Sequence, residues 1–254
     1  MLELRGISAG YRNEPVIEDI TLPFPSGTVT VLIGPNGCGK STLLKTAGRL
    51  LKPMGGSLFL DGEDAGSLSP KAFARRVAML PQAREIPAIP VDMLVMHGRF
   101  PYLGFPRIPS TRDMRLAEAA MERAGVLSLR NQELTTLSGG ERQRAYLAML
   151  LAQDAETVLL DEPSTYLDIG HQLETLRLLD GLRREGRAVA AVMHDLPQAL
   201  AAADTVVLME EGRIRLIGTP EEVFSSGEIE KVFGVRGHRL YSENGREHYV
   251  FTES

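Results

Sequence analysis

The chain is poor in the features that mark several classes of protein. Its 254 residues include a single cysteine, Cys38, and no tryptophan. One cysteine cannot form an internal disulfide, which excludes a disulfide scaffold and favours a reducing compartment. No apolar run approaches the ~18 residues that span a bilayer. The start of the chain, residues 1–5, also lacks the basic and then apolar order of a signal peptide. We therefore expect a soluble chain.

The chain also lacks a surplus of positive charge. Lys and Arg number 28 against 33 Asp and Glu, so the net charge is −5, which argues against a nucleic-acid binder. The hydrophobic fraction of 43% and the charged fraction of 24% are ordinary for a globular protein with a real core. This length suits one large domain, or a core that carries an inserted subdomain.

Strands and helices alternate along most of the chain. Short apolar, β-branched runs predict strands within residues 1–33, including 29–33, and at 57–60, 157–160, 188–193, 205–209 and 213–217. Apolar residues at helical spacing predict helices at 40–51, 91–97, 111–124, 141–152, 169–184, 197–202 and 220–233. A last hairpin is expected around Glu243-Asn244-Gly245. The alternation predicts an α/β fold whose mostly parallel sheet is covered on both faces.

A block after residue 82 interrupts this alternation. Five of the 15 prolines stand between residues 83 and 109, around one short helical stretch, and a longer polar helix follows. We therefore predict a core of residues 1–82 and 156–254, with a helical subdomain of residues 83–155 inserted in it.

One glycine-rich segment fits the pattern of a phosphate-binding loop in full, between a buried strand and an amphipathic helix. Its residues are Gly34, Pro35, Asn36, Gly37, Cys38, Gly39, Lys40, Ser41 and Thr42. Glycines let backbone N–H groups turn towards phosphate oxygens, and the helix N-terminus adds partial positive charge. Lys40 is predicted to reach the β- and γ-phosphates, and Ser41 to ligate Mg²⁺.

Two adjacent carboxylates, Asp161 and Glu162, follow the apolar strand at 157–160. Open α/β sheets bind ligands at the carboxyl ends of their strands. Asp161 suits the Mg²⁺ shell, and Glu162 suits polarising an attacking water. An acidic strand end that simply meets solvent is the alternative, which the neighbouring phosphate loop disfavours.

A second glycine-rich helix start lies at 137–143. Ser138 and Glu141 have the spacing of a capping box, but this does not explain Gly139 and Gly140, because glycine in a first turn weakens a helix by about 1 kcal/mol relative to alanine. Glycines there make sense if the backbone approaches a ligand closely. The segment is therefore a candidate for a second anion site.

In chain order, the phosphate loop at 34–42, the glycine-rich helix start at 137–143 and the acidic strand end at 157–163 resemble the motifs of an ATP-binding-cassette (ABC) ATPase, and the resemblance spans essentially the whole chain. It implies a P-loop NTPase core with an antiparallel β subdomain and an inserted helical subdomain. It also implies ATP hydrolysis, with ATP and Mg²⁺ bound. Cys38 then is a small filler within the phosphate loop rather than a redox sensor.

Further positions match the family residue by residue. Tyr11 stands where the family stacks an aromatic ring on adenine. Gln82 stands where it places a glutamine that touches Mg²⁺ and relays to a membrane partner. Asp168 matches the aspartate that crosses to the other subunit, and His194 the histidine at the γ-phosphate. Taken singly, Tyr11 could be a packing residue, Gln82 a loop amide and His194 a capped core histidine.

The family pairs two chains head to tail. The resemblance implies that residues 138–140 of one chain cover the γ-phosphate held by Lys40 of the other. ATP then closes the dimer and hydrolysis lets it open, since a ligand that touches both chains favours the closed state.

The segments 95–103 and 164–172 resemble those of importers of ferric siderophores, haem and cobalamin. This implies the ATPase subunit of an iron-chelate importer, peripheral on the cytoplasmic face of the plasma membrane, with permease subunits and a substrate-binding protein as separate chains. Haem and cobalamin stay open as solutes. A soluble ABC ATPase of nucleic-acid repair or translation is disfavoured, because the chain has one cassette, a short insert and net negative charge.

The permease is expected to contact the insert between Gln82 and about residue 109. Phe100, Tyr102, Leu103 and Phe105 could form an exposed patch that seats a short helix. Equally, these side chains could form the small core of the insert itself.

Overall fold

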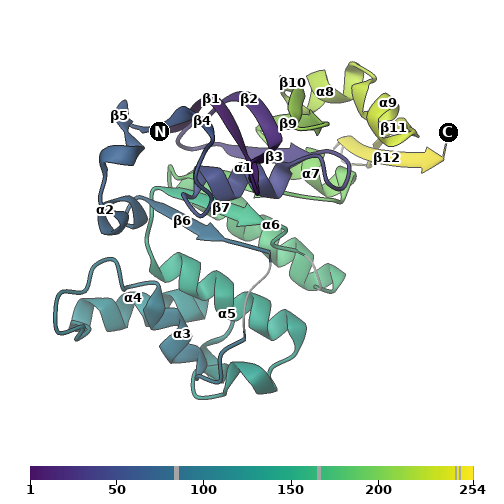
Figure 1. Cartoon of the computed structure of the whole chain (residues 1–254). Coiled ribbons are helices and arrows are strands. Elements are labelled where there is room, and N and C mark those ends of the chain that lie inside the picture. The colour runs from purple at the N-terminus through teal and green to yellow at the C-terminus, as the bar shows by residue number, and fades with distance from the viewer. Residues whose placement is uncertain (83–85, 165–166, 244, 246, 254) are drawn as a thin grey trace.

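The computed structural model describes residues 1–82, 86–164, 167–243, 245 and 247–253. Two sheets and a short hairpin lie on one side of the molecule, and a group of helices lies on the other (Figure 1). The strands are β1 (Leu2–Tyr11), β2 (Glu14–Phe24), β3 (Val29–Ile33), β4 (Gly55–Leu60), β5 (Glu63–Asp64), β6 (Val77–Leu80), β7 (Thr157–Asp161), β8 (Ala188–Val192), β9 (Thr205–Glu210), β10 (Arg213–Gly218), β11 (Val235–Tyr241) and β12 (Glu247–Glu253). The helices are α1 (Lys40–Ala47), α2 (Pro70–Ala74), α3 (Val91–His97), α4 (Thr111–Arg123), α5 (Gly139–Ala152), α6 (Ile169–Arg184), α7 (Leu196–Ala202), α8 (Pro220–Ser225) and α9 (Glu228–Phe233).

The central sheet has the strand order β10-β9-β3-β8-β7-β6. Its pairs β9–β3, β3–β8, β8–β7 and β7–β6 are parallel, and β10 joins antiparallel to β9 as an edge hairpin. This confirms the mostly parallel sheet and the hairpin after residue 209. The parallel register places the ends of β7 and β8 side by side, with Asp161 opposite Val192.

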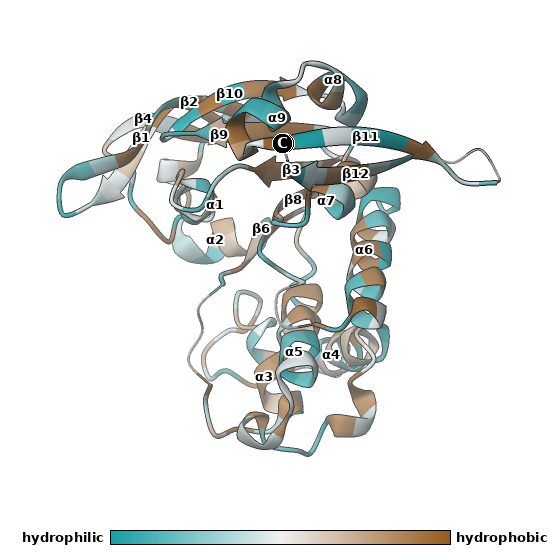
Figure 2. Cartoon of the chain, turned by 90° about the vertical axis from the view of Figure 1, so that its right-hand side faces the viewer, coloured by the Kyte–Doolittle hydropathy of each residue, from teal (hydrophilic) through white to brown (hydrophobic). Residues whose placement is uncertain are grey.

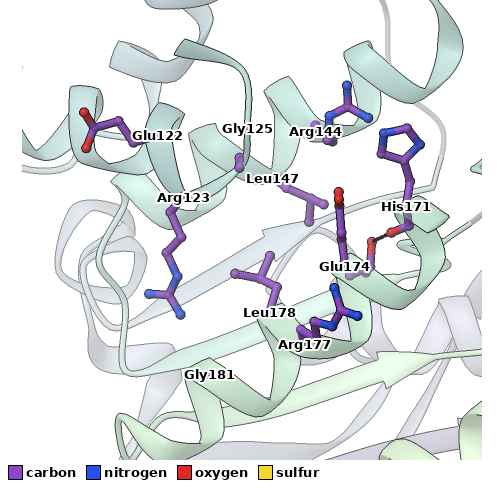
Figure 3. Close-up of a pocket in the computed structure, with 12 residues that line it drawn as sticks. Glu122, Arg123, Gly125, Arg144, Leu147, His171, Glu174, Arg177, Leu178 and Gly181 are labelled. Carbon is purple, nitrogen blue, oxygen red and sulfur yellow. Dashed lines mark hydrogen bonds between the residues drawn. The ribbon is translucent and has the colours of Figure 1, made fainter.

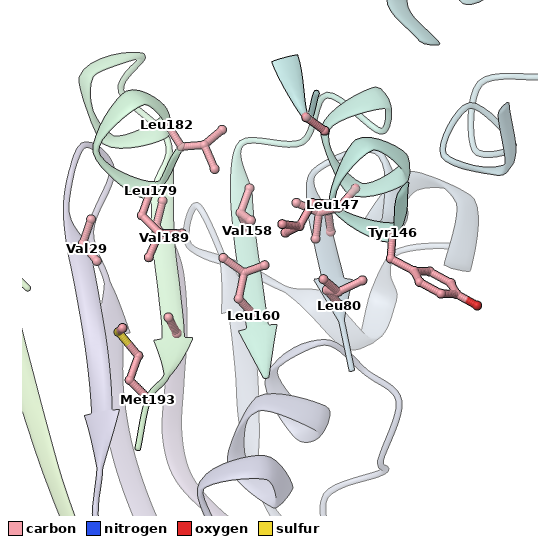
Figure 4. Packing of buried hydrophobic residues seen from close by; sticks show 14 of the residues in the cluster. Val29, Leu80, Tyr146, Leu147, Val158, Leu160, Leu179, Leu182, Val189 and Met193 are labelled. Carbon is pink, nitrogen blue, oxygen red and sulfur yellow. The ribbon is translucent and has the colours of Figure 1, made fainter. Parts of the chain in front are cut away.

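Both faces of this sheet are apolar because side chains alternate along each strand. On β7, Val158 and Leu160 face one core with α5 and α6, whereas Leu159 faces the other. Figure 4 shows Val158 and Leu160 beside Leu147 of α5. A strand buried on both faces reads as a continuous apolar run, which is why β7 could be predicted.

The opposite face is covered by α1 and by a second, antiparallel sheet of order β2-β1-β4-β5. Strand β1 pairs antiparallel with both β2 and β4. Helix α1 packs its buried Leu43 and Leu44 into the same core as Leu4 of β1 and Leu32 of β3. The expected antiparallel β subdomain is therefore present.

Helices α3, α4 and α5 pack on one another, and they lie away from the antiparallel sheet (Figures 1 and 2). The limits of the inserted subdomain at residues 83 and 155 remain a prediction, and residues 83–85 lie outside the described part. No helix in the described ranges combines the length and the apolar composition needed to cross a lipid bilayer.

Two predicted helices differ clearly from the observed ones, whereas the others agree to within two residues. The helix expected at 40–51 ends at Ala47, because Gly48 and Arg49, which has φ of 57°, close it with a turn. The helix expected at 220–233 is two helices, separated at Gly227, which adopts φ of 72°. The final hairpin pairs Tyr241 with Glu247, as expected, although Asn244 of its turn lies outside the described residues.

Candidate functional site

The glycine-rich loop runs from the end of β3 to the start of α1. Its shape requires glycine at two positions. A Cβ at Gly34, whose φ is 151°, would lie 2.2 Å from the carbonyl oxygen of Met209, and one at Gly39 would lie 2.4 Å from Cγ2 of Ile17. Gly39 is the N-cap of α1 with φ of 101°, and no side chain caps this helix. The first-turn N–H groups of α1 therefore face the loop without a side-chain acceptor.

The side chain of Lys40 is buried and folds back over the loop. Its Nζ donates to the carbonyl oxygens of Gly34 at 2.7 Å and Pro35 at 2.8 Å. The buried sulfur of Cys38 lies 3.7 Å from the same ammonium. Two backbone carbonyl oxygens thus accept hydrogen bonds from the Lys40 ammonium.

Asp161 is fully buried at the end of β7 and accepts a 2.8 Å hydrogen bond from Ser41 Oγ at Oδ1. Its Oδ2 is also buried and has no hydrogen-bond partner among the described residues. Burial raises the pKa of this carboxyl, against the opposing effect of the Ser41 hydrogen bond. A buried carboxylate oxygen without a partner, beside a serine hydroxyl, fits the oxygen ligands that Mg²⁺ prefers. Clusters of three His, Cys, Asp or Glu side chains that could hold a metal are absent from the described residues, and this hydroxyl–carboxylate pair needs no such cluster.

Glu162 turns away from the strand that precedes it. Its φ of 55° is uncommon for a residue with a side chain. Gln82 Nε2 donates to its Oε2 at 2.6 Å, and His194 Nε2 lies 2.5 Å from its Oε1. Three side chains that follow three neighbouring strands, β6, β7 and β8, therefore meet at one carboxylate.

These groups share one cavity of about 790 Å³. Its lining consists of Val16, Asn36, Gly37, Gly39, Lys40, Ser41, Thr42, Gln82, Glu162 and His194. The volume is in the range of small-molecule sites. The cavity thus combines the phosphate loop with the predicted carboxylate, amide and imidazole. Val16 lines it as well, a position that the sequence did not single out, since a valine in a strand carries no signal of binding.

Tyr11 is not among the residues that line this cavity. It ends β1, paired with Glu14, and its side chain is 47% exposed. Exposure leaves the ring available to a ligand, and its role in adenine binding stays a prediction.

A second set of predicted residues lies elsewhere, at the N-termini of α5 and α6. Ser138 and Glu141 form the expected capping box, in which Glu141 Oε2 accepts from the backbone N–H of Ser138 at 2.8 Å. The hydrogen bonds from Ser138 hold the pKa of Glu141 below its usual range. A Cβ at Gly140 would meet only Leu167 Cδ2, at an ordinary 3.5 Å. Among the residues that the structure describes, none therefore requires glycine at this position.

Asp168 is the N-cap of α6. It accepts from the backbone N–H of His171 at 2.9 Å and lies 2.8 Å from His171 Nδ1. The His171 backbone N–H, followed by its ring, keeps the pKa of Asp168 low. Asp168 and residues 138–141 do not line the phosphate-loop cavity. Thr165 and Tyr166, which carried part of the importer resemblance, lie outside the described residues.

Another cavity, of about 460 Å³, lies between α4, α5 and α6 (Figure 3). Arg123, Arg144 and Arg177 contribute to its rim, and Leu147 and Leu178 meet between the helices (Figure 3). None of the predicted site residues lines it.

The four side chains of the insert that were expected to form a patch differ in exposure. Phe105 is 100% exposed and Phe100 38% exposed, whereas Leu103 is only 5% exposed and Tyr102 is half-buried. Leu103 therefore belongs to the core of the insert, whereas Phe100 and Phe105 fit the exposed patch, so both alternatives hold for different residues. Phe100 and Phe105 border a hollow of about 490 Å³ together with Lys71 and Arg107, among others.

Comparison with known proteins gives a consistent set of similarities. A family model described as "ABC transporter" matches residues 17–165. The chain is 44% identical over 237 residues to the ferric enterobactin transport ATP-binding protein FepC of Escherichia coli (strain K12), which covers 92% of this chain and 88% of FepC. It is 40% identical, with the same coverage, to the iron(3+)-hydroxamate import ATP-binding protein FhuC of Bacillus subtilis (strain 168). It is 38% identical to the hemin import ATP-binding protein HmuV of Rhodococcus jostii (strain RHA1), over 92% of this chain and 80% of HmuV.

Among solved structures, a chain of an inward-facing metal-chelate type ABC transporter superposes with a TM-score of 0.84. The alignment covers 99% of this chain and 97% of that one, at 24% identity. At this identity the likeness establishes the fold.

Proposed function

The chain belongs to the ABC transporter family, and on that premise we propose that it is the ATP-hydrolysing subunit of an importer of an iron chelate such as a ferric siderophore. The observation that carries the proposal is the cavity in which Glu162, held by Gln82 and His194, faces Lys40 and Ser41 of the phosphate loop.

ATP binding follows from the loop geometry. Backbone N–H groups of residues 36–41 and the N-terminus of α1 surround the phosphates, and the Lys40 ammonium exchanges its carbonyl acceptors for β- and γ-phosphate oxygens. The adenine is assigned to stack on the exposed ring of Tyr11. Ser41, Asp161 and Gln82 would hold Mg²⁺, which would neutralise charge on the phosphate oxygens.

Hydrolysis is assigned to Glu162 as the group that orients and polarises the attacking water. The water oxygen forms the new bond to the γ-phosphorus, the bond to the β-phosphate oxygen breaks, and the water proton passes towards the Glu162 carboxylate. His194 contacts the opposite carboxylate oxygen from Gln82 and so holds Glu162 in place. His194 also lines the phosphate-loop cavity, which supports its assignment to the γ-phosphate.

Completion of the site requires a second copy of the chain. The N-terminal turn of α5 is exposed, and no described neighbour requires glycine at Gly140. Both features suit an approach of Ser138 and Gly140 to the γ-phosphate that Lys40 of a partner chain holds. Asp168 lies near it at the start of α6 and is assigned to the contact between the two chains. ATP bound between both surfaces then closes the head-to-tail dimer.

The transport assignment rests on the relatives, whose names specify ferric enterobactin, iron(3+)-hydroxamate and hemin import. Haem and cobalamin are the alternative solutes. The chain would act at the cytoplasmic face of the plasma membrane, peripheral to permease subunits, with a periplasmic or surface binding protein delivering the solute. Nucleic acid is not a proposed partner.

The permease is assigned to the hollow bordered by Phe100 and Phe105. A fully exposed phenylalanine beside an apolar hollow is a liability in a free monomer and an anchor in a complex.

Substitution Glu162→Gln tests the catalytic assignment. ATP hydrolysis should fall by about 10²–10⁴-fold, while ATP affinity stays at the wild-type level, because the amide keeps the contacts but cannot take the proton. Phosphate release and equilibrium binding of a fluorescent ATP analogue measure the two quantities. Glu174→Gln, an exposed carboxylate of α6, serves as the matched control. Turnover like that of the wild type in Glu162→Gln would remove this residue from the mechanism.

Substitution Phe105→Glu tests the partner assignment. Retention of the permease in a pull-down from solubilised membranes should weaken by at least about tenfold, and uptake of radiolabelled iron chelate should fall with it. Leu240→Glu, on the exposed surface of the C-terminal hairpin, controls for added charge. A complex that survives Phe105→Glu intact would place the permease contact elsewhere.

A further inference from the structure

The segment 98–103 is more deeply embedded than its place in a proline-rich loop suggests. Arg99 is only 3% exposed, although it is an arginine. A buried arginine is costly unless its charge and its N–H groups are satisfied. The role of this residue is not explained by ATP binding, because it lies outside the phosphate cavity.

Arg99 joins three elements at once. Its Nε lies 3.0 Å from Oδ1 of Asp113, in the first turn of α4. Its Nη1 donates at 2.8 Å to the carbonyl oxygen of Ala152, the last residue of α5. Its guanidinium carbon lies 3.9 Å from the ring centroid of Tyr102. A planar guanidinium can satisfy a carboxylate, a carbonyl and an aromatic face together, which an ammonium cannot do.

The carboxylate that pairs with Arg99 is itself held in place by hydrogen bonds. Asp113 is the N3 residue of the α4 capping box and accepts from the backbone N–H and the hydroxyl of Ser110 at Oδ2. These bonds, with burial opposing them and Arg99 adding to them, keep the pKa of Asp113 below its usual range. The carboxylate therefore stays charged opposite Arg99.

The base of the loop is fastened on the other side to α2. The hydroxyl of Tyr102 donates to the carbonyl oxygen of Arg75 at 3.2 Å, and Arg75 Nε donates to that of Pro101 at 2.9 Å. Lys71 of α2 donates to the carbonyl oxygen of Leu103. Gly98 packs so closely on α5 that a Cβ there would lie 2.1 Å from the Met149 carbonyl oxygen.

Beyond this base the loop is exposed. Residues 104–108 carry the fully exposed Phe105 and the exposed Ile108. The fastened base thus connects the exposed tip to the C-terminal end of α5, and the N-terminal end of the same helix carries Ser138. Helix α5 has 14 residues, a span of about 20 Å.

We propose that Arg99 is a positioning residue that makes the tip 104–108 and helix α5 a single rigid body, so that a force on Phe105 displaces the nucleotide-facing end of α5. The coupling to a permease rests on the proposed function. The rigidity itself does not.

Rigidity is tested on the isolated chain. Because the sequence has no tryptophan, Phe105→Trp gives a single reporter at the tip. The pair Arg99→Met with Asp113→Asn removes both charges without leaving one of them buried and alone. Time-resolved fluorescence anisotropy should show a fast segmental motion of the tryptophan that the parent Phe105→Trp chain lacks. Arg130→Met with Glu118→Gln is the matched control and should change nothing, because it removes an exposed ion pair, with a 3.4 Å separation, between α4 and the segment that follows it. Equal anisotropy decays in all three chains would overturn the proposal.

Coupling is tested in the transporter complex isolated through the chain itself, with Phe105 unchanged. Arg99→Met with Asp113→Asn should leave ATP hydrolysis by the free chain within about twofold of wild type, whereas stimulation by the permease should fall by about tenfold. Arg99→Lys should restore part of the stimulation, because it keeps the charge opposite Asp113. Melting curves of the free chains show whether each variant is folded.

A merely structural role would instead lower free and stimulated hydrolysis in parallel, and that result would contradict the inference. A wild-type complex without stimulation would count against the proposed transport function, and the anisotropy result would still decide the rigidity of the tip.

Discussion

Two adjacent carboxylates at the end of β7 have opposite environments. Asp161 completes the strand and is buried with one unpartnered oxygen, whereas Glu162 adopts a positive φ and extends into the cavity between Gln82 and His194. An uncommon backbone conformation at a residue that we propose to act on water is the kind of strain that functional sites retain. The fold gives the two neighbouring acids different surroundings, which suit the different tasks proposed for them.

The buried Asp161 carboxylate should destabilise the nucleotide-free chain. Its pKa is raised by burial, so the folded state holds the proton more tightly than the unfolded state. The stability that this group contributes is present below its unfolded pKa and is lost as pH rises through the raised pKa. Asp161→Asn should therefore raise the melting temperature at neutral pH by roughly a few degrees, and the gain should shrink on acidification.

Thermal melts of both chains between about pH 4 and pH 8 measure this difference. Asp180→Asn is the control of opposite sign, because hydrogen bonding to Arg183 lowers the pKa of that exposed carboxyl. A wild-type chain that is more stable than Asp161→Asn at neutral pH would show that the Ser41 hydrogen bond outweighs burial.

Most of the phosphate-loop cavity could be predicted at the level of residues. Lys40, Ser41 and Glu162 were predicted from motifs, Gln82 and His194 from the family resemblance, and the structure brings the five together. Motifs succeed here because parallel strands end at one edge of the sheet. The positive φ of Glu162 could not be predicted, since a glutamate carries no signal for it.

At the scale of elements, the helices differ in whether a side chain caps their N-terminus. The cap decides which first-turn N–H groups have an acceptor within the chain. Helices α4 and α5 both begin with a capping box, from Ser110 to Asp113 and from Ser138 to Glu141. The N-cap of helix α1, Gly39, offers no side-chain cap. Among the described residues, the first-turn N–H groups of α1 thus have no side-chain acceptor, whereas in α5 the capping box satisfies the N–H of Glu141 and leaves the N–H groups of Gly139 and Gly140 without a side-chain acceptor.

Capping and ligand binding at α5 can be separated by a matched pair of substitutions. Ser138→Ala and Ser110→Ala each remove one capping hydroxyl, and each should lower the free energy of unfolding by about 1 kcal/mol. Only Ser138→Ala should also reduce ATP hydrolysis, because only that hydroxyl is proposed to reach the partner's γ-phosphate. Urea unfolding and phosphate release give the two readouts. Equal activity in the two variants would make Ser138 a cap alone.

The predicted elements were most accurate where local signals agree. The predicted bounds of α3 and α6 equal the observed ones, 91–97 and 169–184. The helix at 40–51 was predicted too long, because Leu50 and Leu51 continue the apolar spacing past Gly48 and Arg49. The embedding of Arg99 in the insert also escaped prediction, since only tertiary packing makes that arginine internal.

At the scale of the whole molecule, the phosphate-loop cavity and the starts of α5 and α6, which we propose as two halves of one nucleotide site, do not share a cavity within one chain. The phosphate-loop cavity has no lining from residues 138–141 or from Asp168. In a head-to-tail pair, the phosphate loop of each chain would face the start of α5 of the other chain. One nucleotide would bind at each of these two contacts. The rate per chain should then depend on how many chains are paired.

Hydrolysis should therefore depend on protein concentration. Rate per chain should fall on dilution, and Glu162→Gln with Mg²⁺ and ATP should accumulate as a particle of twice the 27.8 kDa chain mass, because the bound ligand favours the closed pair. Light scattering after size exclusion measures the mass, with ADP as the control that should leave monomers. A rate per chain that is constant on dilution, together with a monomer in ATP, would refute pairing.

The folded-back ammonium of Lys40 has a consequence for selectivity. Its two neutral carbonyl acceptors are internal competitors that any ligand must displace. An oligophosphate replaces them with several charged oxygens, and hydrogen bonds to charged acceptors are roughly twice as strong as neutral ones. A monophosphate offers fewer charged oxygens for this exchange than an oligophosphate does. We therefore expect the loop to bind nucleoside diphosphates and triphosphates more tightly than monophosphates, whatever the base.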